Sequence, residues 1–429
     1  MRSDITLMCL EDAVEALIDY RGKTPKKTTS GVPLITAKVI KNGEILEPNE
    51  FIAPENYDSW MVRGLPKVGD VVLTVEAPLG QVAQLTESYV ALAQRVVTLR
   101  GKEGVLDNTY LKYLLMTPKM QAALDGRSSG STVKGIKQSE LRKVELELPD
   151  IDTQRKVASI LSSLDNKIAN NKAMNQILEK LAQRIFKSWF IDFDPVKANK
   201  EGLPFDGLSP EIQALFPSEF EDSELGMIPK GWEVSNIEKY ATNVRKNIKK
   251  GDIDSDMPYL GLEHINRKCL SVYEHGLGES VTSNKSQFQV NDILLGKLRP
   301  YFHKVGIPNF DGVCSTDILV VRPKESFYFE YALNVIYQDR LIDHLTRCSS
   351  GTRMPRAKWA DVTDYQLATP LDDGIFKAFS KITSPLYQRL LNNCNEVDIL
   401  SKLRDRLLPK LISGQISVGE VAQELAEAV

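Results

Sequence analysis

The chain has 429 residues, of which 42% are hydrophobic and 26% charged, with a formal net charge of −3. These values are typical of a globular protein of two or three domains, and no apolar run approaches the ~18 residues of a membrane-spanning helix. The negative net charge argues against a protein that holds nucleic acid by bulk charge alone, so that role would need local basic patches or a partner. Early acidic residues argue against a secretory signal, and the five cysteines include no CxxC pair. We therefore expect reduced thiols and a cytoplasmic protein.

Residues 1–150 are predicted to form a mixed, mostly β domain. Strands are expected at residues 71–75, 82–85, 95–99 and 144–148. Residues 108–124 are expected to form a short helix that Pro118 interrupts, because proline cannot donate the backbone hydrogen bond. A small, polar and basic loop, from Arg127 to Lys134, follows that helix.

Residues 151–193 are predicted to form a first long helix, because apolar residues recur there at heptad spacing. Val157, Leu164, Leu178 and Ile185 occupy one heptad position, with Asn171 as its single polar member. We assign the second heptad position to Ile160, Met174 and Leu181. A helix of roughly 35 residues would be ~52 Å long, which suits a coiled coil or a spacer. Asp150 and Asp152 are expected to cap its start.

The second half of the chain repeats the first. After a proline-rich connector (residues 194–230), residues 231–371 repeat the first domain: Val32-Pro-Leu-Ile resembles Met257-Pro-Tyr-Leu, and Ser128-Ser-Gly130 matches Ser349-Ser-Gly351. Residues 372–412 then repeat the long helix, and residues 413–429 form a C-terminal tail. The chain is therefore a tandem duplication in an α+β fold. The residues predicted to pair the two helices are Val157, Leu164, Asn171, Leu178, Ile185, Phe379, Leu386, Asn393, Leu400 and Leu407.

Two details qualify the repeat. Pro385 stands where the first helix has Ser163, which predicts a kink or a late start of the second helix. The first copy has Lys38-Val-Ile-Lys-Asn42 where the second has Glu263-His-Ile-Asn-Arg267. This divergence predicts two sites of one kind with different specificities.

Catalytic motifs are missing from the sequence. There is no GxxxxGK[ST] and no GxGxxG after a predicted strand, so ATP hydrolysis and nucleotide cofactors are not supported. The four histidines have no metal-binding spacing. Asp192-Phe-Asp194-Pro195 superficially resembles an amino-methyltransferase motif, but we interpret it as a helix stop.

Basic and polar residues gather in loops of both copies. Arg and Lys reach phosphates and read base edges in the major groove, and Ser-Ser-Gly loops can add hydroxyl and backbone N–H groups. Each cluster alone would also suit a solvated surface, but recurrence in both copies favours nucleic acid. The predicted DNA-binding residues are Arg21, Lys23, Lys26, Lys27, Arg127, Ser128, Ser129, Lys134, Lys137, Arg245, Lys249, Lys250, Lys297, Arg299, Tyr301, Arg347, Ser349, Ser350, Arg353, Arg356 and Lys358.

With these features, the chain resembles the DNA-specificity subunit of type I restriction–modification enzymes. The resemblance rests on the duplicated architecture and on three segments: Phe186-Lys-Ser-Trp-Phe-Ile-Asp-Phe-Asp-Pro195, Leu225-Gly-Met-Ile-Pro-Lys-Gly-Trp232-Glu-Val, and Leu407-Leu-Pro-Lys-Leu-Ile-Ser-Gly414-Gln-Ile416. It covers essentially the whole chain, although the first domain lacks a clear counterpart of Lys230-Gly-Trp232.

The resemblance implies a non-catalytic subunit without a cofactor or metal of its own. Each recognition domain would read one half of a bipartite site in double-stranded DNA, and the helices would pack antiparallel to fix the spacer. Two methyltransferase subunits carrying S-adenosylmethionine would dock on the helices and domains and flip an adenine for methylation. Motor–nuclease subunits using ATP and magnesium would complete the restriction enzyme, and no membrane would be involved.

Two other functions remain open from the sequence. The chain could be an adaptor that joins two protein partners through its helices without touching DNA. It could also be an enzyme, either a nuclease or a single-chain methyltransferase, which the missing motifs argue against.

Overall fold

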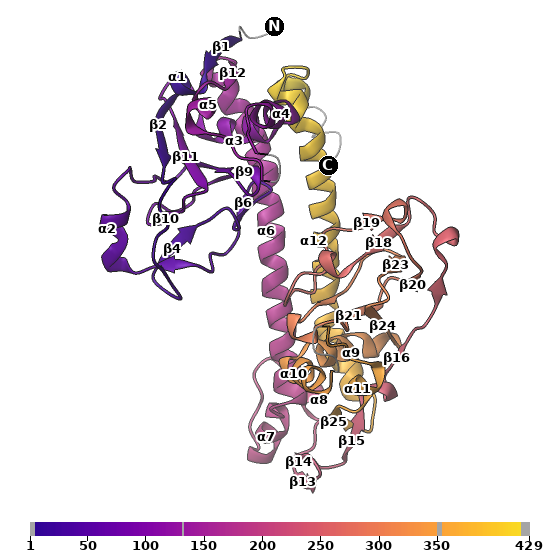
Figure 1. Ribbon diagram of the computed structural model, residues 1–429. Coiled ribbons are helices and arrows are strands. Elements are labelled where there is room, and N and C mark those ends of the chain that lie inside the picture. The colour runs from indigo at the N-terminus through magenta and orange to yellow at the C-terminus, as the bar shows by residue number, and fades with distance from the viewer. Residues whose placement is uncertain (1–4, 131–132, 350–353, 422–429) are drawn as a thin grey trace. The chain divides into compact units, whose positions relative to one another are not determined.

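The computed structural model describes residues 5–130, 133–349 and 354–421, and the chain divides into two compact units (Figure 1). Unit 1 consists of residues 1–166 and 401–429, and unit 2 consists of residues 167–400. The division falls inside the two long helices, α6 (Ile151–Phe190) and α12 (Gly374–Ile412), so each unit contains part of both. These units differ from the predicted domains, which placed each helix outside the domain it follows.

Unit 1 is built around an antiparallel sheet in the order β2 (Val14–Asp19), β11 (Val96–Gly101), β8 (Val71–Val75) and β9 (Leu79–Gln84). A second sheet has the order β10 (Ala91–Leu92), β4 (Val32–Ile35), β7 (Phe51–Ile52) and β3 (Lys27–Thr28). Two strand pairs join β1 (Thr6–Cys9) to β12 (Glu145–Leu148) and β5 (Ile40–Lys41) to β6 (Glu44–Ile45). The short helices are α1 (Leu10–Ala13), α2 (Tyr57–Trp60), α3 (Asn108–Met116), α4 (Pro118–Gly126) and α5 (Gln138–Arg142).

Unit 2 repeats this plan. Its antiparallel sheet has the order β16 (Ala241–Asn243), β24 (Ile318–Pro323), β21 (Ile293–Gly296) and β22 (Val305–Gly306). A second sheet has the order β17 (Asn247–Ile248), β20 (Lys285–Phe288), β23 (Gly312–Cys314), β18 (Pro258–Leu260) and β19 (Gly276–Leu277). Strand pairs join β13 (Phe220–Ser223) to β14 (Gly226–Pro229) and β15 (Trp232–Asn236) to β25 (Gln366–Pro370). The shorter helices are α7 (Asp194–Glu201), α8 (Pro210–Gln213), α9 (Phe329–Tyr337), α10 (Asp339–Cys348) and α11 (Trp359–Thr363).

The predicted duplication is confirmed by the strand pairing. The antiparallel sheet β2-β11-β8-β9 matches β16-β24-β21-β22, and the pair β1–β12 matches β15–β25. Strand β1 therefore corresponds to β15, the strand that begins with Trp232. Both units also contain the same ion pair on a buried aspartate: the Arg100 guanidinium donates to both oxygens of Asp70 at 2.8 and 2.7 Å, and Arg322 donates to Asp292 at 2.7 and 2.8 Å.

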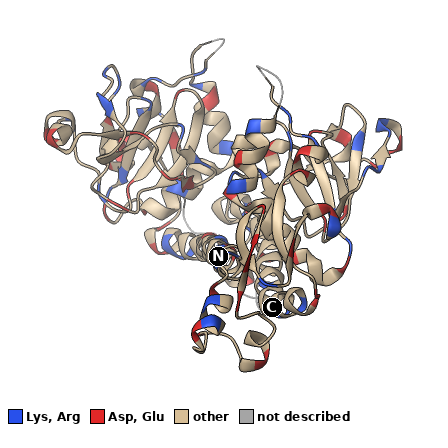
Figure 2. Ribbon diagram, turned by 90° about the horizontal axis from the view of Figure 1, so that it is seen from below, with Lys and Arg blue, Asp and Glu red and all other residues tan. Residues whose placement is uncertain are grey.

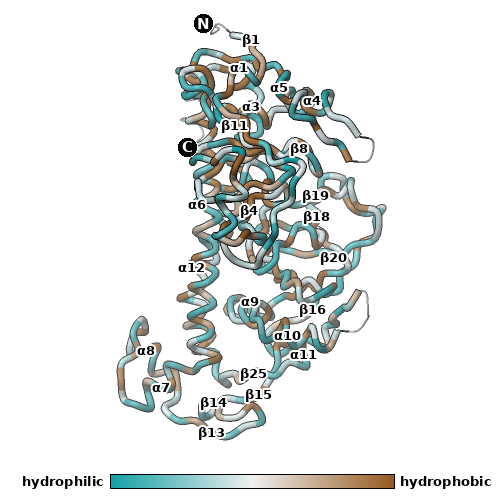
Figure 3. Tube along the Cα trace, turned by 60° about the vertical axis from the view of Figure 1, so that its left-hand side comes forward, coloured by the Kyte–Doolittle hydropathy of each residue, from teal (hydrophilic) through white to brown (hydrophobic). Residues whose placement is uncertain are grey.

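The long helices pair in antiparallel fashion within each unit, and both alternate hydrophobic and hydrophilic residues along their length (Figure 3). In unit 2, Phe190 of α6 stacks on Phe376 of α12 with ring centroids 5.9 Å apart. Asn175 lies about 22 Å before Phe190 along α6, at 1.5 Å per residue. Its Oδ1 accepts a hydrogen bond of 2.8 Å from Asn393 Nδ2 of α12. In unit 1, Arg404 of α12 donates to Asp165 of α6 at 2.9 Å.

The second heptad position of α6 was predicted wrongly. Met174 and Leu181 are 45% and 44% exposed. The buried residues lie four positions after each member of the first set, not three: Leu161, Ile168, Asn175, Ala182 and Trp189. Both spacings keep residues on the same side of a helix, so the sequence permitted either choice. As a result Asn393 meets Asn175 and not Asn171, although Asn171 is also buried.

The predicted pairing residues otherwise lie on the inner face of the helices. Six of them are buried: Val157, Leu164, Asn171, Phe379, Asn393 and Leu407. Four are half-buried: Leu178, Ile185, Leu386 and Leu400.

The helix ends follow the sequence except at Pro385. Asp150 accepts the Thr153 backbone N–H at 2.9 Å as an N-terminal cap, and this bond lowers the pKa of Asp150. After α6 ends at Phe190, Asp194-Pro195 starts α7, which confirms the helix-stop interpretation. The expected late start of α12 is wrong, because the helix begins at Gly374, eleven residues before Pro385. Pro385 is exposed, so the carbonyl that loses its N–H partner can bond to water.

Candidate nucleic-acid interface

In unit 1 the basic loop returns to the edge of the central sheet. The Ile136 N–H donates to the carbonyl of Val75, the last residue of β8, at 3.0 Å. The Arg21 guanidinium donates to the Ile136 carbonyl at 2.8 Å. These contacts bring together two predicted clusters, residues 21–27 and residues 127–137, which lie more than 100 positions apart in sequence.

Unit 2 builds the same arrangement at the end of β21. The Ala357 N–H donates to the Lys297 carbonyl at 2.9 Å, and the Arg299 N–H donates to the Pro355 carbonyl at 2.8 Å. The predicted clusters 297–301 and 347–358 therefore lie together. The third cluster, with Arg245, Lys249 and Lys250, is exposed beside β17. Within the described residues, no hydrogen bond or ion pair joins this third cluster to the other two.

Several of the predicted cations have carboxylate partners. The N–O distances are 2.7 Å for Lys27–Glu50, 3.4 Å for Arg127–Glu140, 2.6 Å for Lys134–Asp125 and 2.9 Å for Arg356–Asp317. In all four pairs the cation is at least 37% exposed and the carboxylate at least 20% exposed, and such surface pairs stabilise a protein by only about 0–1 kcal/mol. A phosphate could therefore replace the carboxylate at small cost.

Other predicted cations are exposed and form no ion pair with any described residue: Lys23, Lys26, Lys137, Arg347 and Lys358. Lys137 and Lys358 occupy the same position, the residue before α5 and before α11 respectively. Figure 2 shows that blue and red residues are interspersed on the loops of both units. The charge pattern thus suits local contacts with phosphates, not one continuous basic face.

The serine loops are less open than the sequence predicted. The hydroxyls of Ser128 and Ser349 donate to carbonyls of the preceding helix, those of Asp125 at 2.7 Å and Thr346 at 2.8 Å. The Ser129 N–H donates to the Gly135 carbonyl at 2.8 Å. These donors are therefore already used within the protein. Ser350 and Arg353 lie outside the described residues.

Sequence reasoning missed two residues beside the second loop. The guanidinium carbon of Arg267 lies 3.8 Å from the centroid of the Phe302 ring. Phe302 directly follows the predicted Tyr301 and also lies 5.9 Å from the guanidinium carbon of Arg299. One signal was available, because Arg267 ends the segment in which the two copies diverge most clearly.

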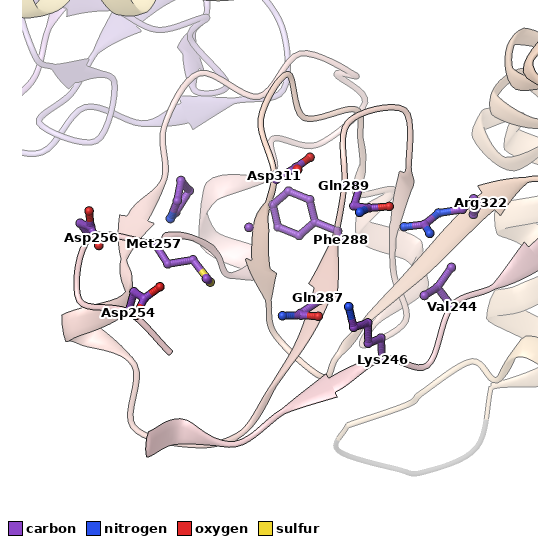
Figure 4. Close-up of a pocket in the computed structure, with 12 residues that line it drawn as sticks. Val244, Lys246, Asp254, Asp256, Met257, Gln287, Phe288, Gln289, Asp311 and Arg322 are labelled. Atoms are coloured by element: carbon purple, nitrogen blue, oxygen red, sulfur yellow. The ribbon is translucent and has the colours of Figure 1, made fainter. Parts of the chain in front are cut away.

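A pocket of about 470 Å³ opens on the second sheet of unit 2 (Figure 4). Lys246 and Arg322 line it, but Arg322 is paired with Asp292. Three carboxylates, those of Asp254, Asp256 and Asp311, also line the pocket. Because this lining repels phosphate, the pocket does not belong to the candidate DNA interface.

No described helix is long and apolar enough to cross a membrane. The described residues also contain no group of three or more His, Cys, Asp or Glu side chains that could hold a metal ion. Buried His303 illustrates the ordinary role of the histidines: its Nε2 lies 2.9 Å from the Tyr337 carbonyl, and burial lowers its pKa.

Comparison with known proteins places these features in one family. Residues 3–180 match a family model described as the type I restriction modification DNA specificity domain. The chain is 30% identical over 413 residues to the type I restriction enzyme MjaIX specificity subunit of Methanocaldococcus jannaschii, covering 91% of this chain and 88% of that protein. It is 24% identical over 336 residues to the HindI specificity subunit of Haemophilus influenzae, covering 67% and 72% of the two chains.

A solved structure has the same fold. The crystal structure of the type I restriction–modification S subunit from M. genitalium matches with a TM-score of 0.58 and 14% identity, covering 96% of both chains. At this identity the likeness shows the fold alone. On the sequence relationship to the M. jannaschii protein, the chain belongs to the specificity subunits of type I restriction enzymes, which recognise DNA sequence and are non-catalytic.

Proposed function

We propose that each unit reads one half of a bipartite site in double-stranded DNA. The observation that carries this proposal is the recurrence of one arrangement, a basic loop hydrogen-bonded to the end of β8 in unit 1 and of β21 in unit 2. The frameworks match while the side chains around them differ. A shared framework can place both units on the DNA backbone through phosphate contacts, and different side chains can then contact different bases.

The paired helices would set the spacer between the two half-sites. The 40 residues of α6 correspond to about 60 Å at 1.5 Å per residue, or about one and two-thirds turns of duplex at ~34–36 Å per turn. A seam that buries Asn175 against Asn393 favours one register over shifted ones, because a shift would leave these amides unpaired.

The same helices would dock two methyltransferase subunits. Met174, Ile177 and Leu181 follow one face of α6, and all three are at least 44% exposed. Neighbouring apolar residues exposed on a helix favour contact with a partner protein. The partners would supply S-adenosylmethionine for adenine methylation, and motor–nuclease subunits would supply the ATP- and magnesium-dependent reactions.

Charge reversal tests the interface. We expect Lys137→Glu and Lys358→Glu each to weaken DNA binding by the complex with a cognate methyltransferase subunit at least about tenfold, equivalent to ~1.4 kcal/mol. Assembly with the methyltransferase, measured by gel filtration, should persist. Lys200→Glu is the control, since exposed Lys200 lies on α7 away from both loops in sequence.

Two outcomes would contradict the proposal in different ways. Normal DNA binding by both variants would mean that the interface lies elsewhere. A stable wild-type complex that selects no sequence from a random DNA pool would favour an adaptor that joins protein partners.

A further inference from the structure

The Arg267 guanidinium lies over an aromatic ring near the surface of unit 2. Its guanidinium carbon lies 3.8 Å from the Phe302 centroid, and Tyr301 packs edge-on against the same ring at 4.8 Å. Arg267 is exposed, and Tyr301 is 51% exposed. Stacking uses the face of a guanidinium and leaves its N–H edge available for a planar partner.

The surroundings do not neutralise this guanidinium. Arg267 forms no ion pair with any residue that the structure describes. The nearby carboxylate of Asp339 is already engaged by Lys268 at 2.9 Å and faces His303 at 3.2 Å. Lys304 lies close by: burial is the main cause that lowers its pKa, and the charge of Arg267 lowers it further. Glu263 lies near Lys304 and opposes this lowering, but no described carboxylate pairs with Arg267, so its guanidinium is available for an electronegative ligand.

The Arg267 stack adjoins the loop that carries the predicted DNA contacts. Phe302 and Arg299 belong to one turn, and the Arg299 N–H donates to the Pro355 carbonyl of the second basic loop. A planar, pre-oriented arginine fork beside a phosphate-binding loop matches the bidentate contact with O6 and N7 of guanine in the major groove. Lysine could supply the charge but not this geometry.

We propose that Arg267 reads a guanine in the half-site recognised by unit 2, and that Phe302 positions it. This inference rests on the proposed function, because it assumes that unit 2 reads DNA. Phe302 acts through Arg267 and is a positioning residue, whereas Arg267 touches the base.

In unit 1, the residues that correspond to Arg267 and Phe302 are Asn42 and Gly80, which cannot form this stack. The segment that follows β8, Ala77-Pro-Leu-Gly80, matches Arg299-Pro-Tyr-Phe302 after β21, and both segments begin with φ of 51°. Asn42, which corresponds to Arg267, lies in the turn between β5 and β6, where its N–H donates to Gln81 Oε1 at 3.0 Å. Loss of Arg267 should therefore change one half-site only.

The test is mapping of methylated adenines in a methylation-free host that expresses the full chain with a cognate methyltransferase subunit. For Arg267→Ala we expect discrimination for guanine at one position of one half-site to fall about 10- to 100-fold, since a bidentate contact contributes ~1–3 kcal/mol. The other half-site and the spacer should not change. Arg267→Lys should relax the same position, and Phe302→Leu should relax it partially. Arg340→Ala, at another exposed arginine of unit 2, is the control and should leave the motif intact.

The outcomes separate this inference from the proposed function. A wild-type bipartite motif that Arg267→Ala leaves unchanged would overturn the inference alone. Weaker methylation of every site by Arg267→Ala, restored by Arg267→Lys, would show a phosphate contact and would also overturn it. Absence of any bipartite motif for the wild type would contradict the proposed function itself. Thermal unfolding, measured for each variant, checks that the substitution has not prevented folding.

Discussion

The two units use different side-chain contacts to hold a short helix against a long helix: α3 against α6 in unit 1, and α9 against α12 in unit 2. In unit 1, Asp165 of α6 accepts hydrogen bonds from Lys112 Nζ at 2.8 Å, from the Tyr113 hydroxyl at 2.7 Å and from Arg404 at 2.9 Å. The residue 222 positions after Asp165 is Tyr387, and the residue 222 before Arg404 is Ala182. Helices α3 and α9 correspond at an offset of 221, so Lys112 and Tyr113 match Leu333 and Asn334. In unit 2 the charged cluster is thus replaced by one neutral hydrogen bond, from Asn334 Nδ2 to the Tyr387 hydroxyl at 2.8 Å. One fold therefore accepts either solution at the same place.

Helix α6 contributes a carboxylate to each unit, Asp165 and Glu179, and the pKa values of these two groups are shifted in opposite directions. Burial opposes the ionisation of Asp165, but the charge of Lys112 and the hydrogen bonds outweigh it and lower the pKa of Asp165. In unit 2, α6 carries the buried carboxylate of Glu179, which accepts the Leu270 N–H at 3.1 Å and the Ser271 hydroxyl at 3.1 Å. Burial raises the pKa of Glu179 despite these bonds. Acid should therefore reduce the contribution of Asp165 to the stability of unit 1 and increase the contribution of Glu179 to the stability of unit 2.

The largest effect is expected from Asp165→Asn. The side chains of Lys112 and Arg404 are only 10% and 15% exposed, so removal of the carboxylate leaves Lys112 without an ion-pair partner and leaves Arg404 with only Asp405, whose side chain is 64% exposed. We expect a loss of about 3 kcal/mol in the free energy of unfolding at pH 7, measured by urea denaturation. The difference from the wild type should shrink as pH falls through the lowered pKa of Asp165. An unchanged midpoint at pH 7 would show that the cluster does not secure the helix.

A smaller effect is expected at the matching position of unit 2. Tyr387→Phe removes one neutral hydrogen bond and leaves no charge unpaired, so we expect a loss of about 1 kcal/mol. Asn334 Nδ2 also donates to the Glu330 carbonyl at 2.7 Å, which limits the cost. The same urea experiment measures the loss. A loss of stability equal to that of Asp165→Asn would contradict the proposed difference between the charged cluster of unit 1 and the neutral hydrogen bond of unit 2.

The smallest effect is expected from Glu179→Gln, and it concerns pH. Because the pKa of Glu179 is raised, the wild type should gain stability from this group as pH falls from neutral to the ordinary glutamate value of about 4.3. The variant should lack that gain. Melting temperatures of both proteins between pH 7 and pH 4.5 measure the difference. Parallel curves would show that Glu179 does not titrate in this range.

Periodic and repeated features could be predicted from the sequence. The repeat of Val68-Gly-Asp70 as Val290-Asn-Asp292 marks a buried, ion-paired aspartate in both units, and Pro118 does separate α3 from α4. Such features depend on neighbours in sequence or on the duplication itself. The choice between Met174 and Asn175 as the buried residue could not be made, because it depends on what α12 presents across the seam.

Contacts between distant segments could not be predicted either, because they depend on how the chain folds and not on a local pattern. The stacking of Arg267 on Phe302 joins residues 35 positions apart and has no periodic signature. The pairing of Lys134 with Asp125 likewise depends on how the loop closes. The sequence could therefore indicate which basic loops are candidates for DNA contact, but not which of their side chains are already paired within the protein.

The central claim is that two units read separate half-sites while paired helices set the spacer, and mapping of methylated adenines tests it most directly. The wild type is compared with a variant that carries one extra heptad in each helix, after Asn171 in α6 and after Glu396 in α12, since Lys167 meets Glu396 at 3.0 Å near this level. Seven residues add about 10 Å of helix, or about 3 base pairs at 3.4 Å each. We predict a bipartite motif for the wild type and the same half-sites, about 3 base pairs further apart, for the variant. A variant motif with altered half-sites and an unchanged spacer would contradict the account.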